Sequence, residues 1–217
     1  MSEQTDIRLG AGVMSSDEVN VGTIVSLLVD ADGFTPRALI VKHEESLARR
    51  VLAAEKYFTT DEVVIPITAV ASAADGVVHL SMAAQDVRGQ PLYLSYRRPA
   101  PTAEESLVEE GQLITGGLGL PKVEEVANKS DGQVEIDRGE NVMLGTTGRR
   151  LGRVDDVLLD HGQLIGVVIR PEGFFRRDVV LPVRFINRAD DMALFADLSE
   201  SDIDQLKPFV DDEGPAV

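Results

Sequence analysis

The chain has 217 residues, 43% of them hydrophobic, and a formal net charge of −16 from 37 acidic and 21 basic side chains. This length fits one large domain or two small ones with a buried core. The acidic excess opposes binding to nucleic acids and anionic lipids unless a local basic patch overrides it. The sequence has no cysteine, which excludes disulfides and thiolate zinc sites. It also lacks an apolar run that could span a bilayer and a signal peptide, so we expect a cytoplasmic protein without membrane insertion.

An internal repeat dominates the sequence. The segment VNVGTIVSLLVD, which ends at Asp30, matches RRLGRVDDVLLD, which ends at Asp160. The segment VVIPITAV, which begins at Val63, matches VVLPVRFI, which begins at Val179. The offset between the copies is larger for the first pair of segments, so the first copy carries an insertion, largely within residues 43–62. A fixed pattern of this kind indicates two structurally equivalent units.

Apolar residues alternate along both copies, which is the periodicity of β-strands. Short turn signals such as ADG, DHG and PEG separate the strands. Pro66 and Pro182 occupy the same place in an apolar strand, and we expect a bulge or an unpaired edge there because proline cannot donate to a ladder. In the second copy, the residues predicted to share one strand face are Ile165, Val167 and Ile169, and then Val179, Leu181, Val183 and Phe185.

Several short strands within each copy predict an all-β fold of two small antiparallel barrels, because closure removes exposed edges. A short helical or turn segment is expected after each barrel. In the second copy, Ser199 and Asp202 have capping-box spacing, which predicts a short helix ending before Pro208.

The repeat boundaries divide the chain into a first barrel domain, a partly ordered linker, a second barrel domain and an acidic tail. The linker is rich in proline and acids. Capping-box spacing in it predicts a brief helix at 103–110, and its later apolar residues could instead pack onto a barrel. The four predicted ranges are 7–96, 97–132, 133–210 and 211–217.

Both copies share four features, which are a glycine before a long strand, a hairpin into LIVK or VVIR, a VVIP or VVLP strand, and a final strand after an ADG or ADD turn. In these four features the chain resembles the PRC-barrel domain. The chain is thus similar to a tandem PRC-barrel protein. This family includes the cytoplasmic domain of the photosynthetic reaction-centre H subunit and the C-terminal domain of the bacterial ribosome maturation factor. The chain lacks the membrane span of the former and the distinct N-terminal domain of the latter. The resemblance implies a binding or assembly module without an active site.

The residues that usually carry chemistry are scattered. His43, His79 and His161 lack the spacing of metal ligands, and His161 falls in a turn. Nucleotide-binding and nucleophile motifs are absent from the sequence. Asp155 and Asp156 are neighbours in a strand and point to opposite faces, so they cannot share a proton or a metal ion. We therefore expect no enzymatic activity, no metal, no cofactor and no small-molecule substrate.

One patch of the second copy is a candidate partner-binding surface. Residues 137–198 contain nine arginines and no lysine against ten acids. The hairpin RPEGFFRRD places two phenylalanines between guanidinium groups, and arginine and aromatic side chains are common anchors of protein interfaces. Alternatively, a phenylalanine covers the end of the barrel while the arginines pair with Asp178 and nearby acids. The candidate residues are Arg170, Phe174, Phe175, Arg176 and Arg177.

These observations predict a noncatalytic protein-binding or assembly module whose partner is another protein or a second copy of the chain. The second copy is nearly neutral, whereas the rest of the chain is acidic, so an acidic protein surface suits it better than nucleic acid. Direct nucleic-acid binding is not expected. The alternative is a ribosome- or RNA-processing-associated accessory factor that docks through the second barrel.

Overall fold

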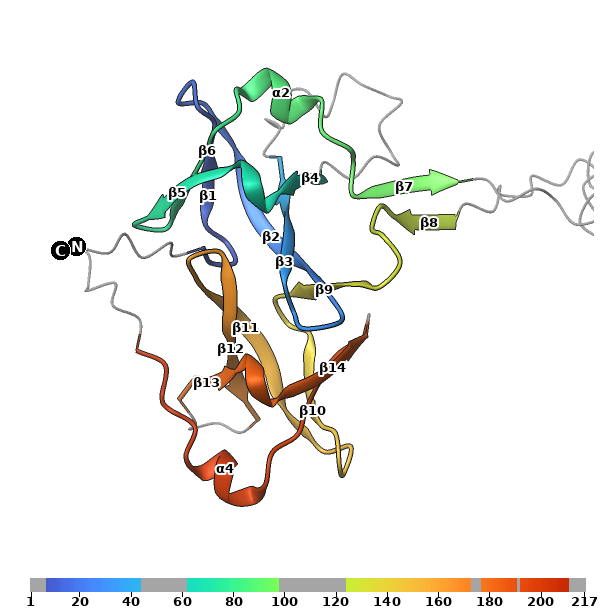
Figure 1. Cartoon of the computed structure of the whole chain (residues 1–217), viewed down its shortest axis with the longest axis vertical. Coiled ribbons are helices and arrows are strands. Elements are labelled where there is room, and N and C mark those ends of the chain that lie inside the picture. Colours follow the sequence, from blue (N-terminus) through green and yellow to red (C-terminus); the bar gives the residue numbers. More distant parts are fainter. Residues whose placement is uncertain (1–6, 44–61, 98–123, 173–176, 191, 211–217) are drawn as a thin grey trace, which may run out of the picture.

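The computed structural model describes residues 7–43, 62–97, 124–172, 177–190 and 192–210. These residues form mainly β-strands with a few short helices, so the predicted β-rich fold is confirmed. Two curved sheets lie one above the other along the long axis of the molecule (Figure 1). None of the helices that the structure describes is long and apolar enough to cross a lipid bilayer.

The first sheet is built around the long strand β2, which pairs with β1 and β3 and also with β9. Strand β1 pairs with β6 in parallel, and every other pairing in this sheet is antiparallel. In hydrogen-bonding order the strands are β4 (Glu62–Pro66), β3 (Pro36–Lys42), β2 (Asn20–Asp30), β1 (Gly12–Met14), β6 (Val77–Leu80) and β5 (Val70–Ala74), with β9 (Gln133–Asp137) beside β2.

The second sheet has the same strand order as the first. Its strands β10 and β15 form the parallel pair, and the remaining pairs are antiparallel. In order, the strands are β13 (Val179–Pro182), β12 (Gln163–Pro171), β11 (Arg150–Asp160), β10 (Asn141–Leu144), β15 (Ala193–Ala196) and β14 (Ile186–Asp190).

The prediction of closed antiparallel barrels is wrong in two respects, because the sheets are mixed and neither of them closes. The edges of the first sheet, β4 and β5, follow each other in sequence and are joined by the 3-10 turn η1 (Ile67–Ala69). Turn η2 (Val183–Phe185) joins β13 to β14 in the same way. Pro66 and Pro182 precede these turns, and because proline lacks a backbone donor the ladder stops there. Both prolines end strands at the edges of their sheets, and neither pairing contains a bulge. The prediction that Val183 and Phe185 continue the strand of Val179 and Leu181 is wrong, because these two residues belong to turn η2.

A short helix follows each sheet, as predicted. Helix α2 (Ala84–Arg88) follows β6, and helix α4 (Glu200–Asp204) follows β15. The buried Ala84 and Val87 side chains anchor α2 to the core. Each helix has only five residues, so its stability comes from packing rather than from its own hydrogen bonds.

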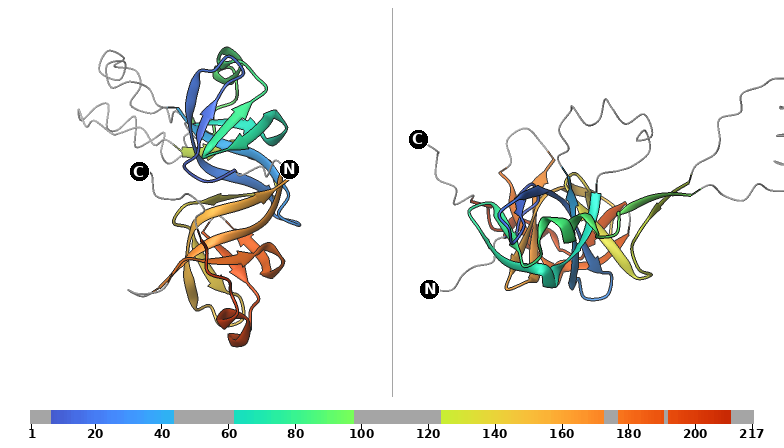
Figure 2. Two further views of the ribbon diagram at one scale, coloured as in Figure 1. Left: turned by 90° about the vertical axis from the view of Figure 1, so that its left-hand side faces the viewer. Right: turned by 90° about the horizontal axis from the view of Figure 1, so that it is seen from above.

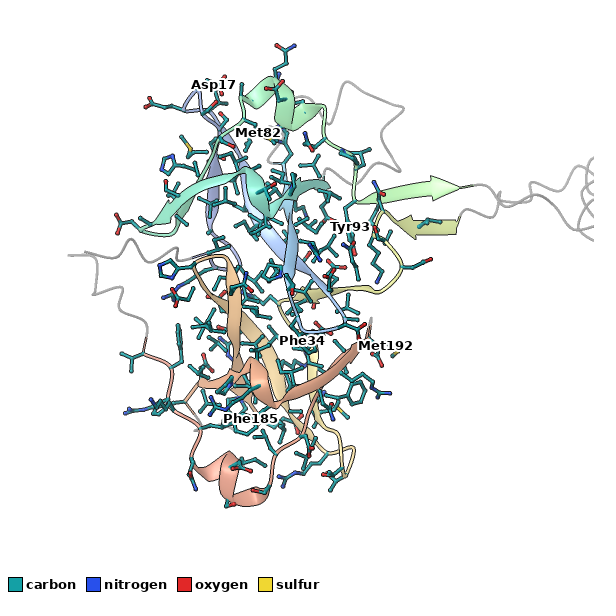
Figure 3. The ribbon with its side chains drawn as sticks, viewed as in Figure 1. Asp17, Phe34, Met82, Tyr93, Phe185 and Met192 are labelled. Atoms are coloured by element: carbon teal, nitrogen blue, oxygen red, sulfur yellow. The ribbon has the colours of Figure 1, made fainter. Side chains whose placement is uncertain are left out.

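The buried apolar side chains of both halves form one continuous cluster, which includes Leu27 and Leu39 of the first sheet and Leu181 and Leu194 of the second. All four of these side chains are fully buried. Phe34, at the tip of the β2–β3 hairpin, also belongs to this cluster and lies near the boundary between the halves (Figure 3). Burial of apolar surface thus holds the two sheets together as well as stabilising each one.

The alternation predicted for β12 fails at Ile165, which is 49% exposed although Val167 and Ile169 are buried. In the pairing with β11, Leu158 lies opposite Gly166 and Leu159 lies opposite Leu164. Ile165 has no partner and is therefore the extra residue of a β-bulge. A bulge shifts the alternation by one residue and turns the side chain outward.

Two further strands, β7 (Leu94–Arg97) and β8 (Glu124–Ala127), pair with each other and form an arm (Figures 1 and 2). Tyr93 at its base packs on Leu28 and Ile40, on the outer face of the first sheet. Strand β8 falls within the predicted linker 97–132, whose predicted helix at 103–110 lies outside the described residues. The predicted domain ranges remain predictions. Strand β9, which lies in the predicted second barrel range 133–210, pairs with the first sheet.

Candidate functional site

A cavity of about 480 Å³ opens at the end of the second sheet, between strands β11, β12 and β13 and helix α4. These elements lie together at the lower left of Figure 1. We call this feature the mouth cavity. It is lined by Arg149, Arg150, Leu151, Ile169, Pro171, Glu172, Arg177, Val179, Ile203, Leu206 and Pro208.

The floor of the mouth cavity is apolar. Ile169 is 1% exposed and belongs to the main core. Leu151 and Val179 from the strands, and Ile203 and Leu206 from the helical segment, are partly buried against that core. The floor is thus an uncovered part of the core surface, and an apolar side chain placed on it would lose contact with water, which favours binding.

Helix α4 is held over the cavity at both of its ends. The Ser199 hydroxyl accepts a hydrogen bond from the N–H of Asp202, and the Asp202 carboxylate accepts one from the N–H of Ser199 at 3.0 Å. The Ser199 hydroxyl also donates a hydrogen bond to the Asp202 carboxylate. This bond and the one from the Ser199 N–H lower the pKa of Asp202. After the helix, the N–H of Val180 donates to the carbonyl of Lys207 at 2.9 Å, which ties the chain to the edge of β13. The predicted capping box is therefore confirmed.

The rim of the mouth cavity is cationic. Arg150 pairs with Glu172 and also donates to the side-chain oxygen of Asn141 at 3.3 Å. Arg149 and Arg177 are exposed, and neither has an ion pair within the part of the chain that the structure describes. Two guanidinium groups beside an apolar floor can bind a carboxylate, which accepts paired hydrogen bonds from arginine.

The structure describes two of the five predicted partner-binding residues. Arg170 is 65% exposed and pairs with Asp155 at 2.7 Å and with Asp178 at 3.5 Å. Arg177 lines the mouth cavity. Phe174, Phe175 and Arg176 lie outside the described residues, so their role as interface or as barrel cover remains a prediction.

Arg149, Ile203 and Leu206 contribute to the cavity but were not among the predicted site residues. Arg149 belongs to the arginine-rich stretch that the sequence reveals. The spacing of Ile203 and Leu206 indicates one apolar helix face, but a sequence pattern alone does not show which surface that face covers. The tertiary fold brings α4 and the end of β12 to the same cavity.

Two of the described histidines make local contacts, and the third, His79, is exposed. The ring nitrogen Nδ1 of His43 lies 2.5 Å from the carbonyl of Val21. His161 has a positive φ of 48° in the turn after Asp160 and contacts the Asp160 carboxylate at 2.6 Å. The described residues include no group of three or more His, Asp or Glu side chains placed to hold a metal ion.

Comparison with known proteins gives one match within the chain. Residues 138–201 match the PRC-barrel domain. This range contains strands β10 to β15 and most of the mouth cavity, but it ends before Ile203, Leu206 and Pro208. No curated protein matches the sequence. The match to a PRC-barrel domain therefore covers the second sheet and most of its cavity lining.

Proposed function

We propose that this protein is a noncatalytic tandem PRC-barrel module that binds or assembles with another protein. The observation that carries the proposal is the mouth cavity, an apolar floor under an arginine rim within a PRC-barrel match. Arginine and buried apolar groups are typical of the energetically dominant centre of protein interfaces.

The chemistry of the lining supports binding rather than catalysis. Apart from Glu172, which pairs with Arg150, the described residues that line the mouth cavity are arginines and apolar groups. A general acid or base and an activated nucleophile are the usual requirements of a hydrolytic site, whereas this lining suits an apolar side chain flanked by carboxylates. We therefore propose an acidic protein surface, on another protein or on a second copy of the chain, as the partner.

The tandem part of the proposal rests on the shared strand order of the two sheets. Each sheet has one parallel pair at the same place, a proline followed by a 3-10 turn, and a short helix at its end. We infer that the first sheet is a second PRC-type unit, which would supply a rigid support or a second docking surface.

An affinity purification with matched variants tests the proposal. The test variant, Arg149→Glu with Arg177→Glu, reverses the charge of the rim. The control, Lys42→Glu with Arg88→Glu, makes the same change in net charge at exposed positions of the first half. We expect the test variant to lose specific partners that the control keeps. The proposal is overturned if both variants, once shown to be folded, retain the partners of the wild type.

The ribosome-associated alternative requires a separate measurement. The arginine-rich second half is the feature that favours it. Cosedimentation with ribosomal subunits in moderate salt that is lost in the rim variant and kept in the control would identify a ribosomal protein as the partner. A protein that stays out of the ribosomal fractions rejects this alternative.

A further inference from the structure

A second concave surface, which we call the acidic groove, lies between the arm, strand β9 and the end of β14. Its volume is about 1430 Å³. The arm lies on the right of Figure 1, whereas β13 and α4 lie at the lower left, so the groove and the mouth cavity occupy different sides of the molecule.

Carboxylates crowd one part of this groove. Glu135 and Asp137 belong to β9, Glu140 immediately precedes β10, and Asp190 is the last residue of β14. Glu135 accepts a hydrogen bond from the hydroxyl of Tyr93 at 2.5 Å, which connects the arm to β9. Tyr93 lies next to the arm in Figure 3. The acids therefore come from separate segments that the fold brings to one place.

One cation in the lining, Arg138, donates hydrogen bonds to backbone carbonyls. Its Nε donates to the carbonyl of Asp155 at 2.9 Å, and one terminal nitrogen donates to the carbonyl of Leu9 at 2.8 Å. Both acceptors are backbone carbonyls rather than carboxylates. The remaining charged and titratable lining groups are Glu62, Tyr93, Lys129 and Asp131.

Two polar groups of the groove are buried without hydrogen-bond partners. The Oγ atom of Ser26 has no hydrogen-bond partner, and the residue is only 1% exposed. Ser26 precedes Leu28 by two residues of β2, on the strand face that packs toward Tyr93. Both carboxylate oxygens of Glu140 are also buried and unpartnered. Such groups destabilise the folded protein unless a donor or acceptor satisfies them.

The electrostatics of the groove fit a missing cation. Burial and the neighbouring Asp137 carboxylate raise the pKa of Glu140 to about 8. The polar backbone of Asp137 lowers this pKa by a smaller amount. Burial and the charge of Glu135 also raise the pKa of Asp137. A positive charge between these carboxylates would favour their ionised forms.

We infer that the acidic groove binds an arginine side chain presented by a segment of a partner protein. A guanidinium group carries five donors, and these match several carboxylate oxygens at once. The described residues form no metal-ligand group, which favours a side chain over a metal ion. This inference concerns a different surface from the proposed function and can fail or hold independently of it.

Fluorescence polarisation with defined peptides tests the inference on the full chain. The probe is a fluorescein-labelled glycine–serine peptide with two arginines, and its control has citrulline at both positions. We expect binding to the citrulline peptide to be at least about tenfold weaker, which corresponds to about 1.4 kcal/mol. Equal binding of the two peptides would overturn the inference.

Matched variants locate the binding site. Glu135→Gln with Asp137→Asn removes two charges from the groove, whereas Asp32→Asn with Asp75→Asn removes two exposed charges from turns of the first half. We expect only the groove variant to lose about tenfold in affinity for the arginine peptide. Equal losses in both variants would show general attraction to an acidic protein and would overturn the inference.

The pH dependence supplies a third readout. Binding of the arginine peptide should strengthen between pH 6.5 and 9, because Glu140 loses its proton near pH 8. Glu140→Gln should flatten this profile while remaining folded by circular dichroism. A wild-type profile that is already flat, or one that Glu140→Gln leaves unchanged, would contradict the inferred position of the arginine.

Discussion

The N–H of Leu9 donates a hydrogen bond to the carboxylate of Asp156 at 2.7 Å, across 147 residues of sequence. Leu9 lies just before β1 of the first sheet, whereas Asp156 belongs to β11 of the second. Strand β9 makes the reciprocal connection, since it precedes β10 of the second sheet and pairs with β2 of the first. The segment that leads into each sheet thus contacts the long strand of the other.

Replacement of Asp156 by alanine should destabilise the protein by about 1 to 3 kcal/mol, because the N–H groups of Leu9 and Val157 would lose their shared acceptor. Urea unfolding at pH 7 measures the loss. Asp156→Asn keeps a side-chain acceptor and should cost less. Burial raises the pKa of Asp156, so the neutral amide also avoids a desolvation cost. Hydrogen exchange at the Leu9 amide should be faster in Asp156→Ala than in the wild type. Equal exchange rates would contradict the role of Asp156 as the acceptor for this amide.

Gly22 and Gly152 occupy equivalent places in the two long strands, and neither tolerates a side chain. A Cβ atom would lie 2.1 Å from the carbonyl oxygen of Lys42 at Gly22, and 2.3 Å from that of Arg170 at Gly152. Gly22 also has a φ of +141°, which L-residues rarely adopt. Alanine at either position should cost at least about 1 to 3 kcal/mol, because backbone must move to relieve the clash.

The matched control for the glycine variants is Gly12→Ala. Gly12 lies in β1, where a Cβ atom would meet nothing within 4 Å and φ is not positive. Its unfolding midpoint in urea should stay close to that of the wild type. Similar losses at Gly12 and Gly152 would show that alanine acts through something other than the close strand approach.

The sequence contains the local determinants of this fold but few of the long-range ones. Alternation and the matching glycines predict the long strands, and Ser199 predicts the start of α4. The end of β13 at Pro182 does not follow from the sequence, because the apolar alternation continues through Val183 and Phe185. The parallel pairing of β1 with β6 and β10 with β15 was missed, because it depends on how the chain crosses over rather than on local propensity. The bulge at Ile165 was missed because the apolar pattern runs through it unchanged.

For the candidate sites too, the sequence indicates the local features and not the long-range ones. The arginine-rich stretch of the second copy points to the rim of the mouth cavity, and Arg177 was predicted on that basis. The acidic groove was not predicted, because Ser26, Glu140 and Asp190 are far apart in sequence and meet only when β9 joins the first sheet. No local motif marks such a place.

Arg170→Ala should change the stability by less than about 1 kcal/mol, although the side chain pairs with Asp155 and Asp178. Arg170 is 65% exposed, and exposed ion pairs contribute little because water and salt screen them. Urea unfolding measures this, with Asp155→Ala as the reciprocal variant. If Arg170 belongs to the partner surface, the same variant weakens partner capture at unchanged stability. A loss of several kcal/mol would instead give it a structural role.

Glu140 should make the stability of the protein depend on pH. The pKa of its carboxyl group is about 8 in the folded protein against an ordinary value of 4.5, so the folded state keeps a proton that the unfolded chain releases. The resulting stabilisation is complete below about pH 4.5 and is lost as the pH rises toward 8. Glu140→Gln, which resembles the protonated acid, should therefore exceed the wild type in stability at pH 8.5 by about 1 to 3 kcal/mol.

The comparison between wild type and Glu140→Gln at each pH isolates Glu140 and the carboxylates that interact with it, because titrating residues elsewhere contribute equally to both proteins. Urea unfolding at pH 5 should give nearly equal free energies, and the difference should grow with pH. Asp32→Asn, at an exposed turn, serves as the control and should show no such trend. A constant difference between pH 5 and pH 8.5 would mean that the Glu140 carboxyl group is ionised throughout, and that the buried oxygens find a donor in solution.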